Sequence, residues 1–260
     1  MKLTLDKIEK QAPELLSLVK SSQLSLEKNN LNEHVARVAL MIDISGSMYG
    51  MFKSGQVNEL VKRALPLALQ FDDDGQIDVF CFSNDAHSIG EYGIDNYKNC
   101  VSDIENGPGV GGGTVYHRAL EVVEKFYEGT DLPVYLMFVT DGDTSEKEKA
   151  TKTIKRLSGK PIFIQFIGLG EDYFPDQSEP HAKPKKGLLG RLFGSVSEGS
   201  RMSSGFKFLA DIDDMGGRVV DNANFFAIKE PTSIDDARLY ELLLNEYPQW
   251  LKDMKARDIL

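Results

Sequence analysis

The sequence is poor in cysteine and has no long apolar run. Two cysteines among 260 residues cannot build a disulfide framework, which favours a reducing compartment. No run approaches the ~20 apolar residues that a membrane-spanning helix needs, and the first residues, MKLTLDK, lack the apolar segment of a signal peptide. We therefore expect a cytoplasmic protein.

Positively charged residues are also fewer than negatively charged ones. The chain has 30 Lys and Arg against 40 Asp and Glu, a net charge of −10. Nucleic acids and anionic membranes attract the opposite sign, so we expect no nucleic-acid partner. Residues 171–205, rich in Pro, Ser, Gly and Lys, are interpreted as a long flexible insertion. The basic stretch 183–194 inside it also carries Leu and Phe, so a weak contact with a membrane or an acidic partner is the alternative.

Short apolar runs alternate with helical patterns through the middle of the chain. The predicted strands are Val38–Ile42, Ile77–Ser83, Ala86–Gly90, Val134–Thr140, Ile162–Ile167 and Asn224–Ile228. Five apolar residues in a row indicate a strand buried on both faces, as in a parallel sheet covered by helices. The alternation predicts an α/β fold: a doubly wound, mostly parallel six-stranded sheet flanked by helices, with an antiparallel edge strand at Ala86–Gly90.

Helical patterns are predicted at both ends of this core. We expect a helical extension at 1–33, the α/β domain at 34–230 and a second helical extension at 231–260. Pro13 interrupts the first apolar stripe, so a helix starts or bends there. The stripe suits packing on the core better than a partner, because most amphipathic helices bury their apolar face within their own chain. Ser233 and Asp236 resemble a capping box at the start of the last helical region.

The first predicted strand ends in acidic and hydroxyl side chains. Val38–Ile42 is followed by Asp43, Ser45 and Ser47 in the pattern Asp-x-Ser-x-Ser. Side chains spaced i, i+2 and i+4 can converge where a tight turn leaves a strand. One carboxylate with two neutral hydroxyls makes a hard, all-oxygen half-site that suits Mg²⁺ or Mn²⁺. The turn therefore predicts half of a metal site.

Two further segments complete the predicted site. Thr114 follows three glycines and opens a predicted helix, Thr114–Glu128, and the strand Val134–Thr140 runs directly into Asp141. In an open α/β sheet, ligands bind beyond the carboxyl ends of the strands, where the strand order reverses. We therefore expect Thr114 and Asp141 to meet the Asp43 turn at one rim. A helix N-cap is the alternative role of the Thr114 hydroxyl.

These five positions resemble the metal-ion-dependent adhesion site (MIDAS) of von Willebrand factor A (vWA) domains, and the superfamily resemblance covers roughly residues 35–228. It implies a Rossmann-like fold and a bound divalent cation, Mg²⁺ or alternatively Mn²⁺ or Ca²⁺. By resemblance, Ser45, Ser47 and Thr114 ligate the metal, while Asp43 and Asp141 act directly or through water. A partner protein would then supply a Glu or Asp carboxylate to the open coordination position.

Three stretches resemble the bacterial tellurium-resistance-associated (TerF-like) branch of this superfamily. They are Val38–Met48, Val219–Phe226 and Tyr247–Leu251. The resemblance implies a protein-binding adaptor in a tellurium-resistance or stress-response system, and not an enzyme. A scaffold with an idle metal site, working through its helical ends and 183–194, is a further alternative.

Two other motifs resemble ligand sites but lack required residues. The run Asp72–Asp74 invites a calcium interpretation, but the closing Glu of an EF-hand loop is missing. We interpret it as a solvated turn at the end of the sheet opposite Asp43. The loop Asn106–Thr114 superficially resembles a phosphate-binding loop, but Gly113 stands where that motif needs lysine. Nucleotide binding is therefore not expected.

A catalytic function is the principal alternative. No Gly-x-Ser-x-Gly elbow surrounds Ser45 or Ser47. His117, one helical turn after Thr114, is the histidine expected near the rim, but the sequence shows no carboxylate to orient it. A metal-dependent phosphoesterase-like hydrolase remains the alternative function, because bound Mg²⁺ can activate water.

Overall fold

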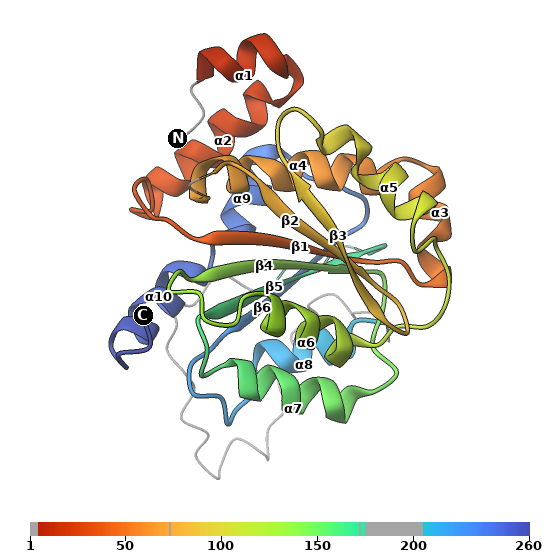
Figure 1. The fold of residues 1–260 in the computed structure, drawn as a ribbon. Helices are drawn as coiled ribbons and strands as arrows, with labels where there is room; N and C mark the ends of the chain where they lie inside the picture. The colour runs from red at the N-terminus through yellow and green to blue at the C-terminus, as the bar shows by residue number, and fades with distance from the viewer. Residues whose placement is uncertain (1–4, 73, 172, 175–204) are drawn as a thin grey trace, which may run out of the picture.

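The computed structural model describes residues 5–72, 74–171, 173–174 and 205–260. Within these residues a six-stranded sheet has the order β3-β2-β1-β4-β5-β6 (Figure 1). The strands are β1 (Arg37–Asp43), β2 (Ile77–Phe82), β3 (Ala86–Tyr92), β4 (Val134–Thr140), β5 (Ile162–Leu169) and β6 (Ala223–Ile228). Neighbouring strands are parallel except β2 and β3, which are antiparallel. The predicted fold class and the antiparallel edge strand are confirmed.

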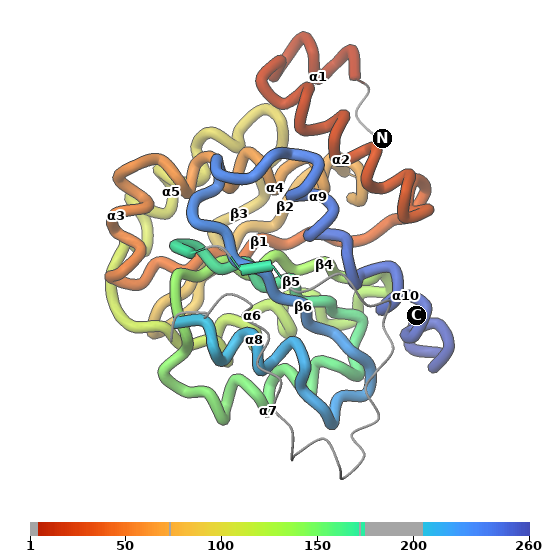
Figure 2. The backbone as a smooth tube through the Cα atoms, turned by 180° about the vertical axis from the view of Figure 1, so that it is seen from behind, coloured from red at the N-terminus to blue at the C-terminus, as the bar shows by residue number. Residues whose placement is uncertain are grey.

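Helices cover both faces of the sheet. On one face lie α6 (Tyr116–Phe126), α7 (Lys147–Leu157) and α8 (Lys207–Asp213) (Figure 1). The core on the other face includes side chains of α4 (Gln56–Phe71), α5 (Cys100–Asn106), α9 (Asp236–Leu243) and α10 (Tyr247–Lys255). The view from behind shows α9 and α10 on the β6 side of the molecule, with the C-terminus beside α10 (Figure 2). Two apolar cores therefore sandwich the sheet, as a doubly wound fold requires.

The central strands are buried along their whole length. All seven residues of β4 are buried, as are all eight of β5. Parallel strands covered by helices on both faces need apolar side chains on both faces, which explains the continuous apolar runs. Helix α4 contains Pro66. Helix α6 begins two residues later than predicted, at Tyr116.

The first helices pack onto the helical layer that contains the last ones. Helix α1 (Leu5–Gln11) ends just before the short turn Pro13–Leu15, and α2 (Leu16–Lys28) contacts α4 and α9. His34 Nε2 lies 2.8 Å from the hydroxyl of Tyr247 in α10. The apolar stripe of this region is thus buried within the chain. The exact domain boundaries stay a prediction.

The last helical region starts differently from the prediction. Asp235 is the N-cap of α9 and accepts a hydrogen bond from the Arg238 N–H at 3.0 Å. The Ser233 hydroxyl instead donates to the Glu230 carbonyl at 2.7 Å. The predicted capping box at Ser233 is therefore wrong, because a longer turn precedes the helix and a carboxylate nearer to it fills the same role.

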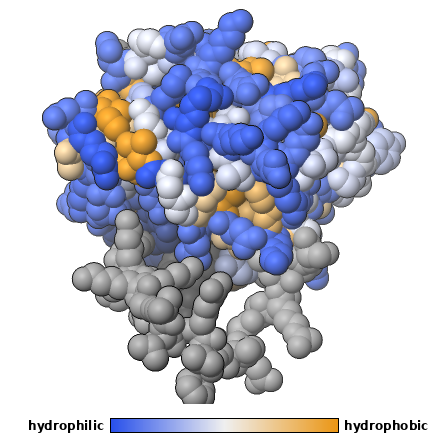
Figure 3. All heavy atoms as spheres, turned by 90° about the horizontal axis from the view of Figure 1, so that it is seen from below, coloured by the Kyte–Doolittle hydropathy of each residue, from blue (hydrophilic) through white to orange (hydrophobic). Residues whose placement is uncertain are grey.

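The surface adds two observations. The face seen from below is mostly hydrophilic, with small separate apolar areas (Figure 3). None of the helices among the described residues is both long and apolar enough to cross a bilayer. The basic stretch 183–194, and nearly all of the proposed insertion 171–205, lie outside the described residues.

Candidate metal centre

The predicted site residues gather where the strand order reverses. β1 lies between β2 and β4, so the chain builds the sheet outward from β1 first on one side and then on the other. Ile42 pairs with Val139, which places the ends of β1 and β4 side by side. Asp43 and Asp141 therefore leave the sheet at adjacent positions, as expected for a ligand site in an open α/β fold.

Asp43 forms the buried floor of the site. Its side chain is fully buried and accepts two hydrogen bonds at 2.7 Å, from the Ser45 N–H to Oδ1 and from the Thr140 hydroxyl to Oδ2. Both carboxylate oxygens are thus held by the protein. This arrangement fixes the Ser45 turn above the strand end.

The two serines and the second carboxylate lie directly above this floor. Ser45 Oγ lies 3.1 Å from Ser47 Oγ, and the Ser47 hydroxyl donates to Asp141 Oδ1 at 2.8 Å. Ser45 is buried, whereas Ser47 is exposed at the rim. The structure thus brings together four of the five predicted ligands: Asp43, Ser45, Ser47 and Asp141.

Thr114 reaches this rim through its main chain. The Gly111 N–H donates to the Ile44 carbonyl at 2.7 Å, and the Gly46 N–H donates to the Gly112 carbonyl at 3.1 Å. These bonds join the Thr114 loop to the Asp43 turn. The Thr114 hydroxyl forms no hydrogen bond with any described residue, and the Tyr116 N–H at the start of α6 donates instead to the Thr144 hydroxyl at 3.2 Å. The alternative role of Thr114 as a helix cap is therefore not realised.

The electrostatics of the site favour a cation. Burial raises the pKa of Asp43 to about 6, and the nearby charge of Asp141 adds to the rise. Burial also raises the pKa of Asp141 above its usual range. Two carboxylates close together at a rim disfavour each other's ionisation, and an opposite charge between them removes that cost. The donor set, two carboxylates with neutral hydroxyls, fits a hard divalent cation.

Two residues that the sequence analysis missed support the floor. Thr140 is fully buried and positions Asp43, as described above. The buried Tyr116 hydroxyl donates to the Gly142 carbonyl and lies 3.4 Å from the Thr140 hydroxyl. For Thr140, the available signal was its position immediately before Asp141, at the end of a strand that pairs with β1. Nothing local to Tyr116 indicates its contact with the neighbouring loop.

His117 has a carboxylate neighbour that the sequence did not reveal, although its Nδ1 forms no hydrogen bond with a described residue. Its Nδ1 lies 3.1 Å from Glu146 Oε2, and its side chain is 11% exposed. Glu146 directly follows Ser145, whose N–H donates to the Thr114 carbonyl at 3.1 Å. The imidazole–carboxylate pair therefore flanks the Thr114 loop.

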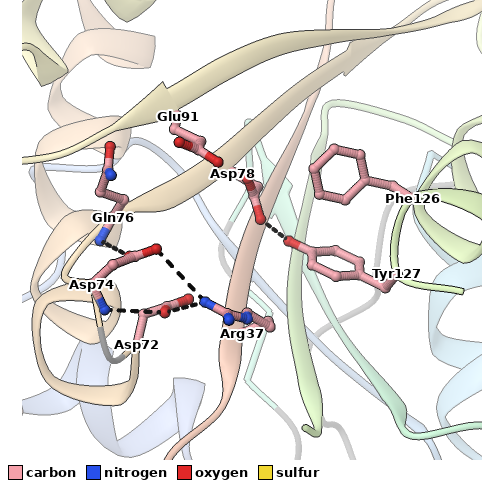
Figure 4. A pocket seen from close by; sticks show the side chains of 8 residues that line it. All are labelled: Arg37, Asp72, Asp74, Gln76, Asp78, Glu91, Phe126 and Tyr127. Carbon is pink, nitrogen blue, oxygen red and sulfur yellow. Dashed lines mark hydrogen bonds and ion pairs between the residues drawn. The ribbon is translucent and has the colours of Figure 1, made fainter. Parts of the chain in front are cut away.

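The acidic turn lies at the opposite end of the sheet, as predicted. Arg37, at the start of β1, contacts Asp72 at 2.8 Å and Asp74 at 3.6 Å beside a cavity of about 270 Å³ (Figure 4). The solvated-turn interpretation is wrong for Asp72, which is 3% exposed, because Arg37 pairs with it. Across the same cavity Tyr127 donates to Asp78. The described residues contain no group of three or more His, Cys, Asp or Glu side chains placed to hold a metal.

Comparison with known proteins gives one family and one fold. A family model described as the vWA domain found in the TerF C terminus, vWA-TerF-like, matches residues 35–175 and 199–260. The uncharacterised protein YcbR of Bacillus subtilis (strain 168) is 31% identical over 247 residues, covering 93% of this chain and 88% of that protein. The crystal structure of the conserved hypothetical protein BatB from Bacteroides thetaiotaomicron aligns with a TM-score of 0.50, 14% identity and coverage of 84% and 99%. At that identity the likeness to BatB shows the fold alone.

Proposed function

Since the chain belongs to the vWA-TerF-like family of von Willebrand factor A domains, we propose that it is a metal-dependent protein-binding module. The observation that carries this proposal is the continuous run of oxygens Ser45 Oγ, Ser47 Oγ and Asp141 Oδ1, with successive separations of 3.1 and 2.8 Å. These oxygens lie over a buried Asp43 whose geometry is already fixed by the fold. They would hold Mg²⁺, or alternatively Mn²⁺ or Ca²⁺.

The chain's residues suit binding at an open coordination position. Ser45, Ser47 and Thr114 would contribute neutral hydroxyls, and Asp43 would act through the hydroxyls and water because both its oxygens already accept hydrogen bonds. Neutral hydroxyl ligands leave most of the cation's charge uncompensated, so an open coordination position can take one more carboxylate oxygen. The proposed partner is a protein that presents a Glu or Asp side chain at this rim.

The cellular setting is proposed from family membership. A TerF-like vWA domain suits an adaptor in a bacterial tellurium-resistance or stress-response system, and the cysteine content suits the cytoplasm. In this proposal residues 34–230 carry the binding site, and 1–33 and 231–260 are helical extensions. Binding without turnover is proposed as the activity.

Metal-dependent thermal denaturation tests the site. At a cation concentration of about 100 times Kd, binding adds about 2.7 kcal/mol to the free energy of unfolding, or roughly 5–10 °C in Tm for a domain of this size. We expect this rise for the wild type in MgCl₂ or MnCl₂ against EDTA. Ser47→Ala and the isosteric Asp43→Asn should lose it. Ser102→Ala, which removes an exposed serine bonded only to the Asn99 carbonyl, should keep it.

Capture of acidic peptides tests the partner. A Glu-containing peptide array should bind the wild-type protein in MnCl₂, lose binding in EDTA and lose binding with Ser47→Ala. Replacement of Glu by Gln in a captured peptide should abolish its binding. Capture that survives both EDTA and Ser47→Ala would contradict a metal-held carboxylate.

A second candidate function is favoured by the His117–Glu146 pair. An imidazole 3.1 Å from a carboxylate, flanking the Thr114 loop, would supply the general base of a metal-dependent phosphoesterase-like hydrolase. Hydrolysis of p-nitrophenyl phosphate in MnCl₂, lost in both His117→Gln and Ser47→Ala, would establish this function. The absence of turnover under conditions where Mn²⁺ stabilises the protein would favour the binding module.

A further inference from the structure

The loop that carries Thr114 is fixed on three sides. Towards the Asp43 turn, main-chain bonds join Gly111 to Ile44 and Gly46 to Gly112. Towards the loop after β4, the Thr114 carbonyl accepts the Ser145 N–H at 3.1 Å. The Thr144 and Ser145 hydroxyls donate to the same carbonyl at 3.1 and 3.2 Å. The other contacts on these two sides are made by main-chain groups.

The third side is fixed by a side chain from the loop after β2. The Gly113 N–H, one residue before Thr114, donates to Asn84 Oδ1 at 3.1 Å. The neighbouring Val115 N–H donates to the Ser83 carbonyl at 3.0 Å. The residues before and after Thr114 therefore both donate a hydrogen bond to the Ser83–Asn84 loop. Asn84 accepts the bond from the residue before Thr114.

The glycines of this loop make room for the same amide. A Cβ added to Gly113 would lie 2.9 Å from Asn84 Oδ1, and one added to Gly112 would lie 3.2 Å from Asn84 Nδ2. Gly112 also has a φ of +91°, which L side chains rarely adopt. The Asn84 amide thus packs against Gly112 and Gly113, and a Cβ added at Gly113 would displace it. This close approach accounts for glycine at positions 112 and 113.

We propose that Asn84 is a positioning residue for the cation: through Gly113, its amide sets the place of the Thr114 hydroxyl. The inference rests on the proposed function, because it assigns a role toward the metal held there. Asn84 itself does not touch the cation. It acts by holding the Gly113 N–H, in addition to the main-chain contacts of the loop and the two hydroxyls that donate to the Thr114 carbonyl.

The expected effect is a loss of metal affinity. A single hydrogen bond contributes about 0.5–1.5 kcal/mol, so its removal from the loop should weaken Mn²⁺ binding about 2- to 13-fold. Asn84→Ala removes the acceptor and should show this loss. Asn84→Asp keeps an acceptor of the same shape opposite Gly113 and should recover binding to at least the wild-type level, since the added charge also attracts the cation.

The chain offers a matched control. Asn96 makes the same kind of bond: its Oδ1 accepts the Gly93 N–H at 2.7 Å. It lies beyond the far end of β3, where Tyr92 pairs with Ile77 at the start of β2. Asn96→Ala therefore removes the same kind of asparagine–glycine contact, together with the Asn96 Nδ2 bond to the Glu91 carbonyl, at the end of the sheet away from the cation site. If the role of Asn84 were only structural, Asn84→Ala and Asn96→Ala would have the same Mn²⁺ affinity.

The experiment measures the Mn²⁺ dissociation constant of the full chain by electron paramagnetic resonance, with Tm in EDTA as the stability readout. We expect both alanine variants to lower Tm, with only Asn84→Ala weakening Mn²⁺ binding and Asn84→Asp restoring it. Equal Mn²⁺ affinity of Asn84→Ala and Asn96→Ala, or an Asn84→Asp as weak as Asn84→Ala, would overturn the positioning role while leaving the metal site intact. If the wild type binds no Mn²⁺ at all, the proposed function fails, and this inference fails with it.

Discussion

Replacing Thr140 by valine should destabilise the protein in a pH-dependent way. Thr140 is fully buried, and its hydroxyl donates to Asp43 Oδ2 at 2.7 Å. Valine keeps the shape and removes the donor, so a buried carboxylate loses one of its hydrogen bonds. Hydrogen bonds to charged groups contribute about 1.5–3 kcal/mol. We expect Thr140→Val to lower the free energy of unfolding by about 2–3 kcal/mol at pH 8.

The sign of the pH dependence follows from the pKa of Asp43. Burial raises this pKa from 3.8 to about 6 in the folded protein. A carboxyl whose pKa is higher in the fold than in the unfolded chain destabilises the fold fully above pH 6, and this cost fades as the pH falls toward 4. Loss of the Thr140 donor raises the pKa further, so the stability gap between Thr140→Val and wild type should be larger at pH 8 than at pH 5.

Urea unfolding in EDTA at the two pH values measures this gap. Thr140→Ser, which keeps the hydroxyl and loses only a methyl group, is the control and should show little pH dependence relative to wild type. A Thr140→Val gap that is equal at pH 5 and pH 8 would refute the reasoning. So would a Thr140→Ser variant with the same pH-dependent loss.

Three further predictions concern other parts of the fold. Arg63 is buried in α4 and contacts Asp236 at 2.6 Å. Arg63→Met should therefore lower the free energy of unfolding, measured in urea, by about 2–4 kcal/mol. It should also expose residues 231–235 to proteolysis. Burial raises the pKa of Glu246 to about 8, so wild-type stability should fall as the pH rises from about 5 to about 8, and Glu246→Gln should flatten that fall in a pH series of melts. Arg37→Met removes the guanidinium beside Asp72 and should lower stability by about 1–3 kcal/mol, while the Mn²⁺ dissociation constant stays unchanged at the opposite end of the sheet.

The sequence predicts the parts of the site that depend on strand ends. Asp43 ends one apolar run, and Asp141 follows Thr140 at the end of another. Parallel strands place such ends at one edge, so their meeting follows from pattern alone. The Asn84–Gly113 contact joins residues 29 apart in sequence through two loops, and no periodic pattern encodes it. Exposed loop asparagines are common and usually serve their own turn. Such contacts are decided by tertiary packing.

The helix starts show a second kind of limit. Ser233 and Asp235 both carry an oxygen suited to an N-cap, and the sequence favoured the serine because Asp236 follows at capping-box spacing. In the structure Ser233 is committed to the Glu230 carbonyl, which leaves Asp235 to cap α9. Both residues offer a capping oxygen, and the preceding turn decides which of them is used.

The most direct test of the account is anomalous X-ray diffraction from crystals grown with MnCl₂. We expect one strong anomalous peak at the rim, within about 2–2.5 Å of the Ser45 and Ser47 hydroxyl oxygens. The Thr114 hydroxyl should be turned toward this peak. The peak should disappear in Asp43→Asn crystals grown in the same way. A peak beside Asp72 and Asp74, or none at the rim in a crystal saturated with Mn²⁺, would contradict the central claim that these loops together hold a cation.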